Sequence, residues 1–230
     1  GGAYYCRPFD SELFAFRLGN RLNLGKGAHI AGAHIDWPCL RIKPAAQLTR
    51  SGYLQANVEV YGGPILSTFF DRPLSIAGKI AVKSEDLFSP RVMEINIPKP
   101  AAIIPNLAIH MSRSLPENGA KIDRQMHLLP LLGTISDTLN KDGILLDFIA
   151  GYAGVDAEDI LDYELCLYNP EAPQCIGIHD EFISAPRLDD LTSACAAILG
   201  LIDSAPDDRM PMTVLFDSDE IGSQSKQGAD

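Results

Sequence analysis

Short apolar runs bounded by turn residues dominate the first part of the chain and predict β-strands. The predicted strands there are residues 3–8, 13–18 and 29–36. Near the other end, an amphipathic run at residues 189–204 predicts a helix, and the apolar run at residues 212–216 predicts a short buried strand. The two ends of the sequence therefore share an α/β rhythm.

The middle of the chain follows a different pattern, in which short β-rich runs predominate. The predicted strands include residues 56–61, 74–82 and 92–97, and the predicted helices lie near residues 128–139 and 143–152. A series of strands with few helices between them indicates a separate β-rich unit.

Two adjacent acids, Asp219 and Glu220, stand just after the apolar run at residues 212–216. Ligands bind at the ends of strands in open α/β sheets. A strand that ends there can aim one carboxylate at a metal and its neighbour at a water, as metal-assisted hydrolysis requires. An exposed acidic turn is the alternative interpretation.

His34 and Asp36 follow another apolar run. Residues i and i+2 of a strand share a face, so the two side chains are expected to point the same way. This arrangement suits a metal-binding imidazole whose orientation is fixed by a carboxylate. A core histidine with local hydrogen bonds is the alternative.

Asp189 lies at or near the N-terminus of the predicted helix at residues 189–204, where its carboxylate can leave the helix axis. A simple N-cap is the alternative. One histidine and two or three carboxylates form a nitrogen and oxygen ligand set that suits zinc, manganese or cobalt in a hydrolytic site.

These three clusters resemble, in order and context, the metal-site motifs of the aspartyl aminopeptidase family of dinuclear zinc exopeptidases. Other stretches that resemble signatures of this family are residues 57–63, 71–78, 104–110 and 162–167. The resemblance covers nearly the whole chain. Members of the family continue beyond this point and close their site with a further carboxylate and a further histidine, so we expect the sequence to be an internal fragment.

The resemblance implies an α/β, zinc-exopeptidase-like catalytic domain with a central mixed sheet flanked by helices. In the family an inserted β-rich dimerisation domain interrupts this domain, and the dimers build a tetrahedral dodecamer. Since His34 precedes the β-rich middle and Asp189 follows it, residues 1–43 and 180–230 are expected to belong to the catalytic domain. Residues 44–179 are expected to form the insertion.

The same resemblance implies a role for each site residue. His34, Asp189 and Glu220 would be ligands of two zinc ions, and Asp189 would bridge the ions. Asp36 would hold the His34 ring, and Asp219 would act as the general base. The side chains of His34, Asp189 and Glu220 are therefore expected to converge.

A histidine matching His110 helps to complete the substrate pocket in the family, and a locally bonded histidine is the alternative here. Three positions depart from the family pattern. Asp219 stands where glutamate is usual, which shortens the side chain by one carbon–carbon link of about 1.5 Å. Asp190 stands where asparagine is usual, and Trp37 replaces a small residue, so an acidic substrate cannot be assumed.

Composition narrows the class of protein. A net charge of −11 argues against nucleic acid as a partner. The longest apolar run, residues 195–202, is far shorter than the roughly 20 residues that span a bilayer, so no membrane association is expected. The five cysteines form no C-x-x-C pair, which favours reduced thiols in the cytoplasm.

The sequence therefore predicts a cytoplasmic metalloaminopeptidase that hydrolyses the N-terminal residue of peptides through a metal-activated water, with acidic residues as one candidate specificity. Self-association to dimers and a dodecamer is expected. The alternative is a catalytically weak or inactive homologue that serves as an assembly or binding protein.

Overall fold

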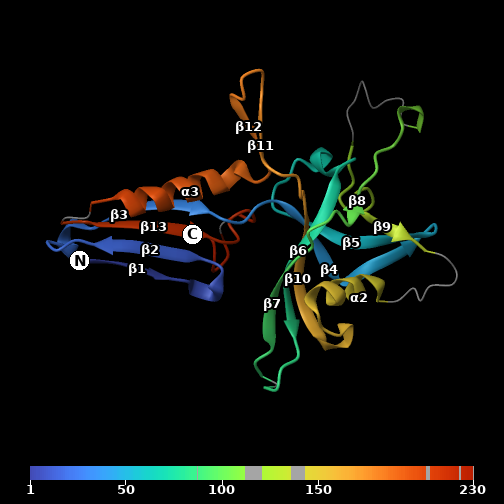
Figure 1. Cartoon of the computed structure of the whole chain (residues 1–230), viewed down its shortest axis with the longest axis horizontal. Coiled ribbons are helices and arrows are strands. Elements are labelled where there is room, and N and C mark those ends of the chain that lie inside the picture. Colours follow the sequence, from blue (N-terminus) through green and yellow to red (C-terminus); the bar gives the residue numbers. More distant parts are fainter. Residues whose placement is uncertain (87, 112–120, 136–142, 206–207, 223, 230) are drawn as a thin grey trace. The chain divides into compact units, whose positions relative to one another are not determined.

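The structure, a computed structural model, describes residues 1–86, 88–111, 121–135, 143–205, 208–222 and 224–229. The chain folds into two compact units (Figure 1). The first unit combines Gly1–Pro38 with Pro173–Asp230, and the second is Cys39–Ala172. The second unit thus interrupts the first. Its boundaries at residues 39 and 172 each lie a few residues before the expected boundaries at 44 and 179.

A mixed four-stranded sheet forms the centre of the first unit (Figure 1). Its strands are β1 (Gly2–Cys6), β2 (Leu13–Leu18), β3 (Ala28–His34) and β13 (Met210–Phe216), in the order β1-β2-β13-β3. Strand β13 is antiparallel to β2 and parallel to β3. Strands β2 and β3, which are close in sequence, are therefore joined only through a strand from the other end of the chain.

Helix α3 (Leu188–Asp203) packs on β3 and β13. Ala33 and Leu215 from the sheet and Ala194 from the helix form a small buried cluster. The buried Thr213 hydroxyl donates to the carbonyl oxygen of Ala197 at 2.9 Å, which ties the helix to β13. Among the described residues, α3 is the one α-helix of this unit, so the sheet has less helical cover there than was expected.

Arg17 on β2 holds the C-terminal end of α3. Its Nη1 donates to the carbonyl oxygens of Ile202 at 2.7 Å and Leu201 at 3.4 Å, and also to that of Ser204. The last carbonyl groups of a helix lack partners within the helix and carry partial negative charge. A guanidinium at this position therefore satisfies several of them and stabilises the helix end.

The first unit also contains a two-stranded hairpin, and short 3-10 turns occur in both units. The hairpin strands are β11 (Gln174–Ile176) and β12 (Phe182–Ser184), and the 3-10 turns are Pro8–Asp10, Leu24–Lys26, Leu66–Phe69, Ile109–Met111 and Ala157–Asp159.

The second unit is a β-barrel. Its strands are β4 (Cys39–Arg50), β5 (Tyr53–Tyr61), β6 (Pro73–Val82), β7 (Arg91–Asn96), β8 (Ala102–Ile103), β9 (Leu131–Thr134) and β10 (Ile160–Tyr168). The strand order is β10-β4-β5-β9-β8-β6-β7, and β10 also pairs with β6. The second pairing closes the sheet on itself, and β7 lies outside the closed ring on β6.

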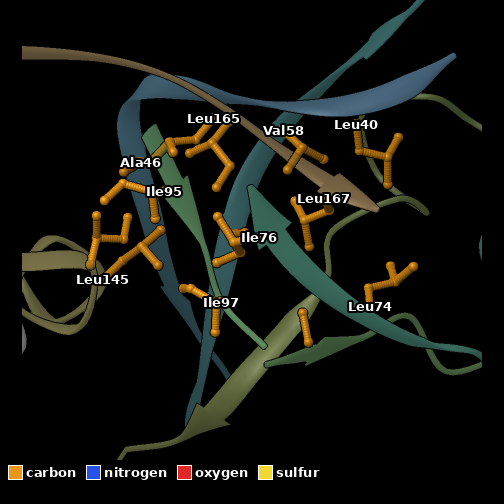
Figure 2. Close-up of a cluster of buried hydrophobic side chains, with 14 of the residues drawn as sticks. Leu40, Ala46, Val58, Leu74, Ile76, Ile95, Ile97, Leu145, Leu165 and Leu167 are labelled. Atoms are coloured by element: carbon orange, nitrogen blue, oxygen red, sulfur yellow. The ribbon is translucent and has the colours of Figure 1, made fainter. Parts of the chain in front are cut away.

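Alternating apolar residues of these strands fill the interior of the barrel (Figure 2). The fully buried residues include Leu40, Val58, Leu74, Ile76, Ile80, Ile97, Leu165 and Leu167. Helix α2 (Ile144–Ala153) adds Leu145 and Ile149 to the same core. Successive side chains of a strand point to opposite faces, so buried residues at every second position are typical of a strand with one face in the core.

Strands β6 and β10 approach each other closely at Gly78, where the barrel closes. The φ angle of Gly78 is +147°, and a Cβ atom there would lie 2.0 Å from the carbonyl oxygen of Glu164. Glycine is therefore required at this position by both backbone conformation and space.

Most strands expected from the sequence are confirmed, as are the helices near residues 143–152 and 189–204. The helix expected near residues 128–139 is wrong, because Leu131–Thr134 form β9, and residues 136–139 lie outside the described residues. Apolar runs of this length fit a strand as well as a helix, and here pairing with β5 and β8 decides. No helix among the described residues is long and apolar enough to cross a membrane.

Candidate metal centre

The parallel pairing of β3 and β13 brings two candidate motifs to one edge of the sheet. Phe216 lies opposite His34 in the register, and the Ile35 N–H donates to the carbonyl oxygen of Phe216 at 2.9 Å. Parallel strands end at the same edge. The segment with His34 and Asp36 and the acidic segment at residues 217–220 therefore leave the sheet side by side.

Asp36 fixes the orientation of the His34 ring. His34 Nδ1 lies 3.0 Å from the carbonyl oxygen of Asp36 and 3.3 Å from Asp36 Oδ1. A carbonyl oxygen only accepts hydrogen bonds, so Nδ1 carries the proton in this contact. In the neutral ring Nε2 is then the nitrogen that can bind a metal.

The start of α3 supplies the group that Nε2 faces. Asp189 Oδ1 lies 3.5 Å from His34 Nε2, and the His34 backbone N–H donates to Asp190 Oδ2 at 3.2 Å. Arg187, which precedes the helix, has a left-handed backbone conformation with φ of 61°. The backbones of Asp189 and Asp190 are also non-helical, so this turn leads both carboxylates away from the helix axis and towards β3.

Asp219 and Glu220 lie in a tight turn after β13. Ser218 adopts φ of 59°, and the Gly222 N–H donates to the Asp219 carbonyl oxygen at 3.0 Å. The Glu220 N–H donates to Asp36 Oδ2 at 3.0 Å. The turn is thus attached to the same carboxylate that orients His34, and both of its acids are half-buried.

The electrostatic surroundings of His34 favour positive charge. Burial lowers the pKa of His34, but the backbone carbonyl of Asp36 and the carboxylates of Asp36, Asp190 and Glu220 raise it, and the resulting pKa is above its usual value. The pKa of Asp190 is lowered, first by a hydrogen bond from Ser193 and then by the N–H and ring of His34. A cluster that stabilises a proton on an imidazole in this way also attracts a metal cation.

The donor atoms that meet here suit zinc, which binds histidine nitrogen and carboxylate oxygen. His34 Nε2 and Asp189 Oδ1 are such a pair, and Asp36 supports the histidine from behind. The described residues hold no group of three or more His, Cys, Asp or Glu side chains arranged to bind one metal. The charge of Glu220 reaches His34 and helps to raise its pKa, and the role of Glu220 as a further ligand stays a prediction.

His110 lies in the 3-10 turn Ile109–Met111 of the second unit and is exposed. The site residues above all belong to the first unit. The assignment of His110 to a substrate pocket therefore stays a prediction.

Two contacts at the site had no counterpart in the sequence interpretation. Asp190 was noted there only as a departure from the family pattern, yet it accepts the His34 N–H. Arg187 lies with its guanidinium carbon 5.4 Å from the centre of the Trp37 ring. The sequence signal for both is their position next to the candidate ligands, which does not by itself specify a contact.

Comparison with known proteins identifies the family of this chain. Residues 1–230 match the protein family described as aminopeptidase I zinc metalloprotease (M18). The "Probable M18 family aminopeptidase 2" of Clostridium novyi (strain NT) is 45% identical over 231 residues, which are 100% of this chain and 53% of that protein. The chain thus spans about half the length of the curated relatives that it matches.

Solved structures show the same fold. A chain in the cryo-EM structure of the Ape4 and Nbr1 complex superposes with a TM-score of 0.91 at 33% identity, over 100% of this chain and 47% of that chain. A chain in the structure of the S. cerevesiae mApe1 dodecamer gives a TM-score of 0.80 at 28% identity, over 100% and 52% of the two chains.

Proposed function

This chain belongs to the aminopeptidase I zinc metalloprotease (M18) family, and from that membership we propose that the intact protein is a metal-dependent aminopeptidase. Its substrate is a peptide with a free N-terminus, and its reaction is hydrolysis of the first peptide bond by an activated water. The observation that carries this proposal is the 3.5 Å approach of His34 Nε2 to Asp189 Oδ1, with Asp36 behind the imidazole.

In this proposal His34, Asp189 and Glu220 would hold two zinc ions, and Asp189 would be shared between them. Manganese and cobalt are alternatives with compatible ligand preferences. Zinc supplies Lewis-acid activation of the water and of the peptide carbonyl. Asp36 keeps the Nδ1 proton of His34 engaged, so that Nε2 presents its lone pair.

Asp219 accepts a proton from the attacking water. It is the neighbour of a proposed ligand, Glu220, and lies in a turn that the Asp36 carboxylate anchors through the Glu220 N–H. A general base must come within hydrogen-bonding reach of the proton that it removes. Anchoring of the turn therefore serves the base as well as the ligand.

The second candidate function is that of a catalytically weak homologue retained for assembly or binding. The aspartate at position 219 favours it, because this side chain is shorter than glutamate by about 1.5 Å, and misplacement of about 1 Å can cost on the order of 10²-fold in rate. The solved relatives are described as a dodecamer and as a complex of Ape4 with Nbr1. Both candidate functions are compatible with dimers through the β-barrel unit, with a dodecamer and with a cytoplasmic location.

The test uses the intact protein, stripped with a chelator and then reloaded with zinc, manganese or cobalt. Each form is assayed on aminoacyl p-nitroanilides with acidic and neutral residues. An active, metal-dependent wild type supports the aminopeptidase, and the ratio of rates between substrates reports its specificity. A zinc-loaded protein that hydrolyses none of the substrates, with oligomers still present, would favour the assembly role.

A matched pair of histidines on β3 tests the site itself. His34→Ala should abolish tight zinc binding and activity together. His29→Ala should leave both unchanged, because His29 is exposed and contacts Arg209, 2.6 Å away. Equal zinc contents in the two variants would overturn the assignment of His34.

A further inference from the structure

Trp37 and Arg187 flank the contact between the two motifs of the candidate metal centre. Trp37 directly follows Asp36, and Arg187 lies two residues before Asp189. The Arg187 guanidinium carbon is 5.4 Å from the centre of the Trp37 ring, within the range of a cation–π contact. We propose that Trp37 and Arg187 are a positioning pair that holds Asp189 against His34.

Asp189 lies at the surface, so packing does little to fix its side chain. Its side chain is 92% exposed, whereas that of His34 is 18% exposed. Its backbone, with φ of −89° and ψ of 115°, is outside the helical region. An exposed side chain on an irregular turn loses conformational freedom when it becomes a ligand, and contacts of the neighbouring residues reduce that cost.

The contacts between the segments 34–37 and 187–190 include three pairs of residues. His34 Nε2 approaches Asp189, the His34 N–H donates to Asp190, and Trp37 faces Arg187. The contact of Asp189 is the proposed metal-binding one. Along the segment 187–190, the other two contacts involve Arg187 before Asp189 and Asp190 after it. Loss of the Trp37 contact would therefore remove one of the contacts that hold this turn against the end of β3.

The two residue types suit a cation–π contact. Tryptophan offers the strongest aromatic surface for a cation, and the planar guanidinium of arginine can stack on it while keeping its N–H groups available to other partners. Both residues are half-buried, so their contact is partly shielded from water. Because the role of the pair is to place a ligand, its loss should weaken metal binding before it changes peptide recognition. The inference rests on the proposed metal role of His34 and Asp189.

The experiment measures zinc affinity of the intact protein by competition with a chromophoric chelator, with no peptide present. Trp37→Leu and Arg187→Met should each weaken zinc binding by about fivefold, the ratio that a contact of this type supports. The double variant should lose no more than the larger single loss, because residues that act as a pair are not additive. Trp37→Phe and Arg187→Lys, which keep an aromatic ring and a cation, should remain within about twofold of the wild type.

The second unit offers a matched control. Arg41 lies 3.7 Å over the ring of Tyr61, and Tyr61→Leu removes a cation–π contact of the same kind. This variant should lower the thermal midpoint without changing zinc affinity. A similar loss of zinc affinity in Tyr61→Leu would show that general destabilisation explains the result and would overturn the positioning role.

Two further outcomes decide the matter. Unchanged zinc affinity in Trp37→Leu, or additive losses in the double variant, would show that Trp37 and Arg187 do not act as a pair on Asp189. If Arg187→Met does not fold, the comparison of Trp37→Leu with Trp37→Phe decides alone. Tight zinc binding by a wild type that hydrolyses no peptide would refute the aminopeptidase while leaving this inference testable by the same titration.

Discussion

The carboxylate of Asp36 joins the two motifs of the site, because its Oδ2 accepts the backbone N–H of Glu220 at 3.0 Å. Its other oxygen, Oδ1, lies 3.3 Å from His34 Nδ1. One buried carboxylate therefore places negative charge beside the imidazole and anchors an acidic turn through its other oxygen. The two segments are far apart in sequence, so Asp36 couples the placement of a candidate histidine ligand to that of a candidate carboxylate ligand.

Asp36→Asn should weaken zinc binding by about 10- to 100-fold, the usual cost of losing a carboxylate that supports a metal-binding histidine. The amide keeps the shape but removes the negative charge beside His34. Zinc affinity of the intact protein, measured by chelator competition, checks this result. Asp71→Asn is the control, because Asp71 accepts the Asn106 N–H at 2.8 Å in the other unit. Equal affinities in both variants would contradict the role of Asp36.

Asp219→Asn should lower kcat by on the order of 10²–10⁴-fold, which is the usual contribution of a general base. Zinc content should stay at the wild-type level, since Asp219 is not a proposed ligand. Asp217→Asn is the control in the same turn, because an amide oxygen can still accept the Ser218 N–H. Equal metal-dependent rates in wild type and Asp219→Asn would show that Asp219 is not the general base.

Asp219→Glu separates the two candidate functions. If the site has adapted to aspartate, the longer side chain should lower activity or leave it unchanged. If the shorter side chain has weakened the enzyme, the substitution should raise kcat in a protein that already binds zinc. Steady-state kinetics on the best aminoacyl substrate of the wild type would distinguish these outcomes.

The sequence predicted the strands that lead to the candidate site residues, for physical reasons that act over short distances. The apolar run before His34 predicts a strand there, and β3 ends at His34. The apolar run ending at Phe216 likewise predicts that Asp219 and Glu220 follow a buried strand. Predictions of this kind depend only on the spacing of apolar residues and on the polar residues that end an apolar run.

Contacts between distant segments could not be predicted in this way. The hydrogen bond from His34 to Asp190 depends on the left-handed backbone of Arg187, a conformation that residues other than glycine rarely adopt. The strand at Leu131–Thr134 depends on its pairing with β5 and β8, which overrides the helical pattern of its sequence. In both cases the deciding interaction lies with residues far away in the chain.

Arg17→Met should destabilise the first unit by about 1–2 kcal/mol, because the end of α3 loses a cation that binds several of its last carbonyl groups. Chemical denaturation of the intact protein, followed by a probe in α3, measures this change. Arg7→Met is the control. The Arg7 side chain is exposed and donates to the carbonyl oxygen of Asp10, three residues away, rather than to a helix end. A loss of the same size in both variants would argue against the helix end as the cause.

Gly78→Ala should destabilise the barrel by about 3 kcal/mol or more, because overpacking costs of this order arise even without a backbone clash. The added Cβ would lie 2.0 Å from the Glu164 carbonyl oxygen, and the φ angle of +147° is unfavourable for alanine. Gly133→Ala on β9 is the matched control, since no atom lies within 4 Å of its added Cβ. Soluble yield and thermal unfolding should separate the two variants. Similar midpoints would refute the close approach of β6 and β10.

Glu12→Gln should stabilise the first unit near neutral pH. Burial and then the nearby charge of Asp217 raise the pKa of Glu12 above its usual value of 4.5. The folded state therefore holds this proton more tightly than the unfolded state, and stability falls as pH rises from 4.5 through the raised pKa. The advantage of the glutamine variant should vanish below that range. Denaturation midpoints across pH would check it, and a constant difference between variant and wild type would contradict it.

The central place of β13 between β2 and β3 has a consequence for biosynthesis. Strands β2 and β3 are made before the whole of Cys39–Ala172, whereas β13 is made after it. Until then the edges that β2 and β3 will offer to β13 lack their partner, and open strand edges invite pairing with other chains. The barrel is contiguous, so its strands can pair as soon as they emerge from the ribosome. During the interval between these events the open edges of β2 and β3 are exposed to wrong pairing, and the candidate metal-binding motifs come together only at its end.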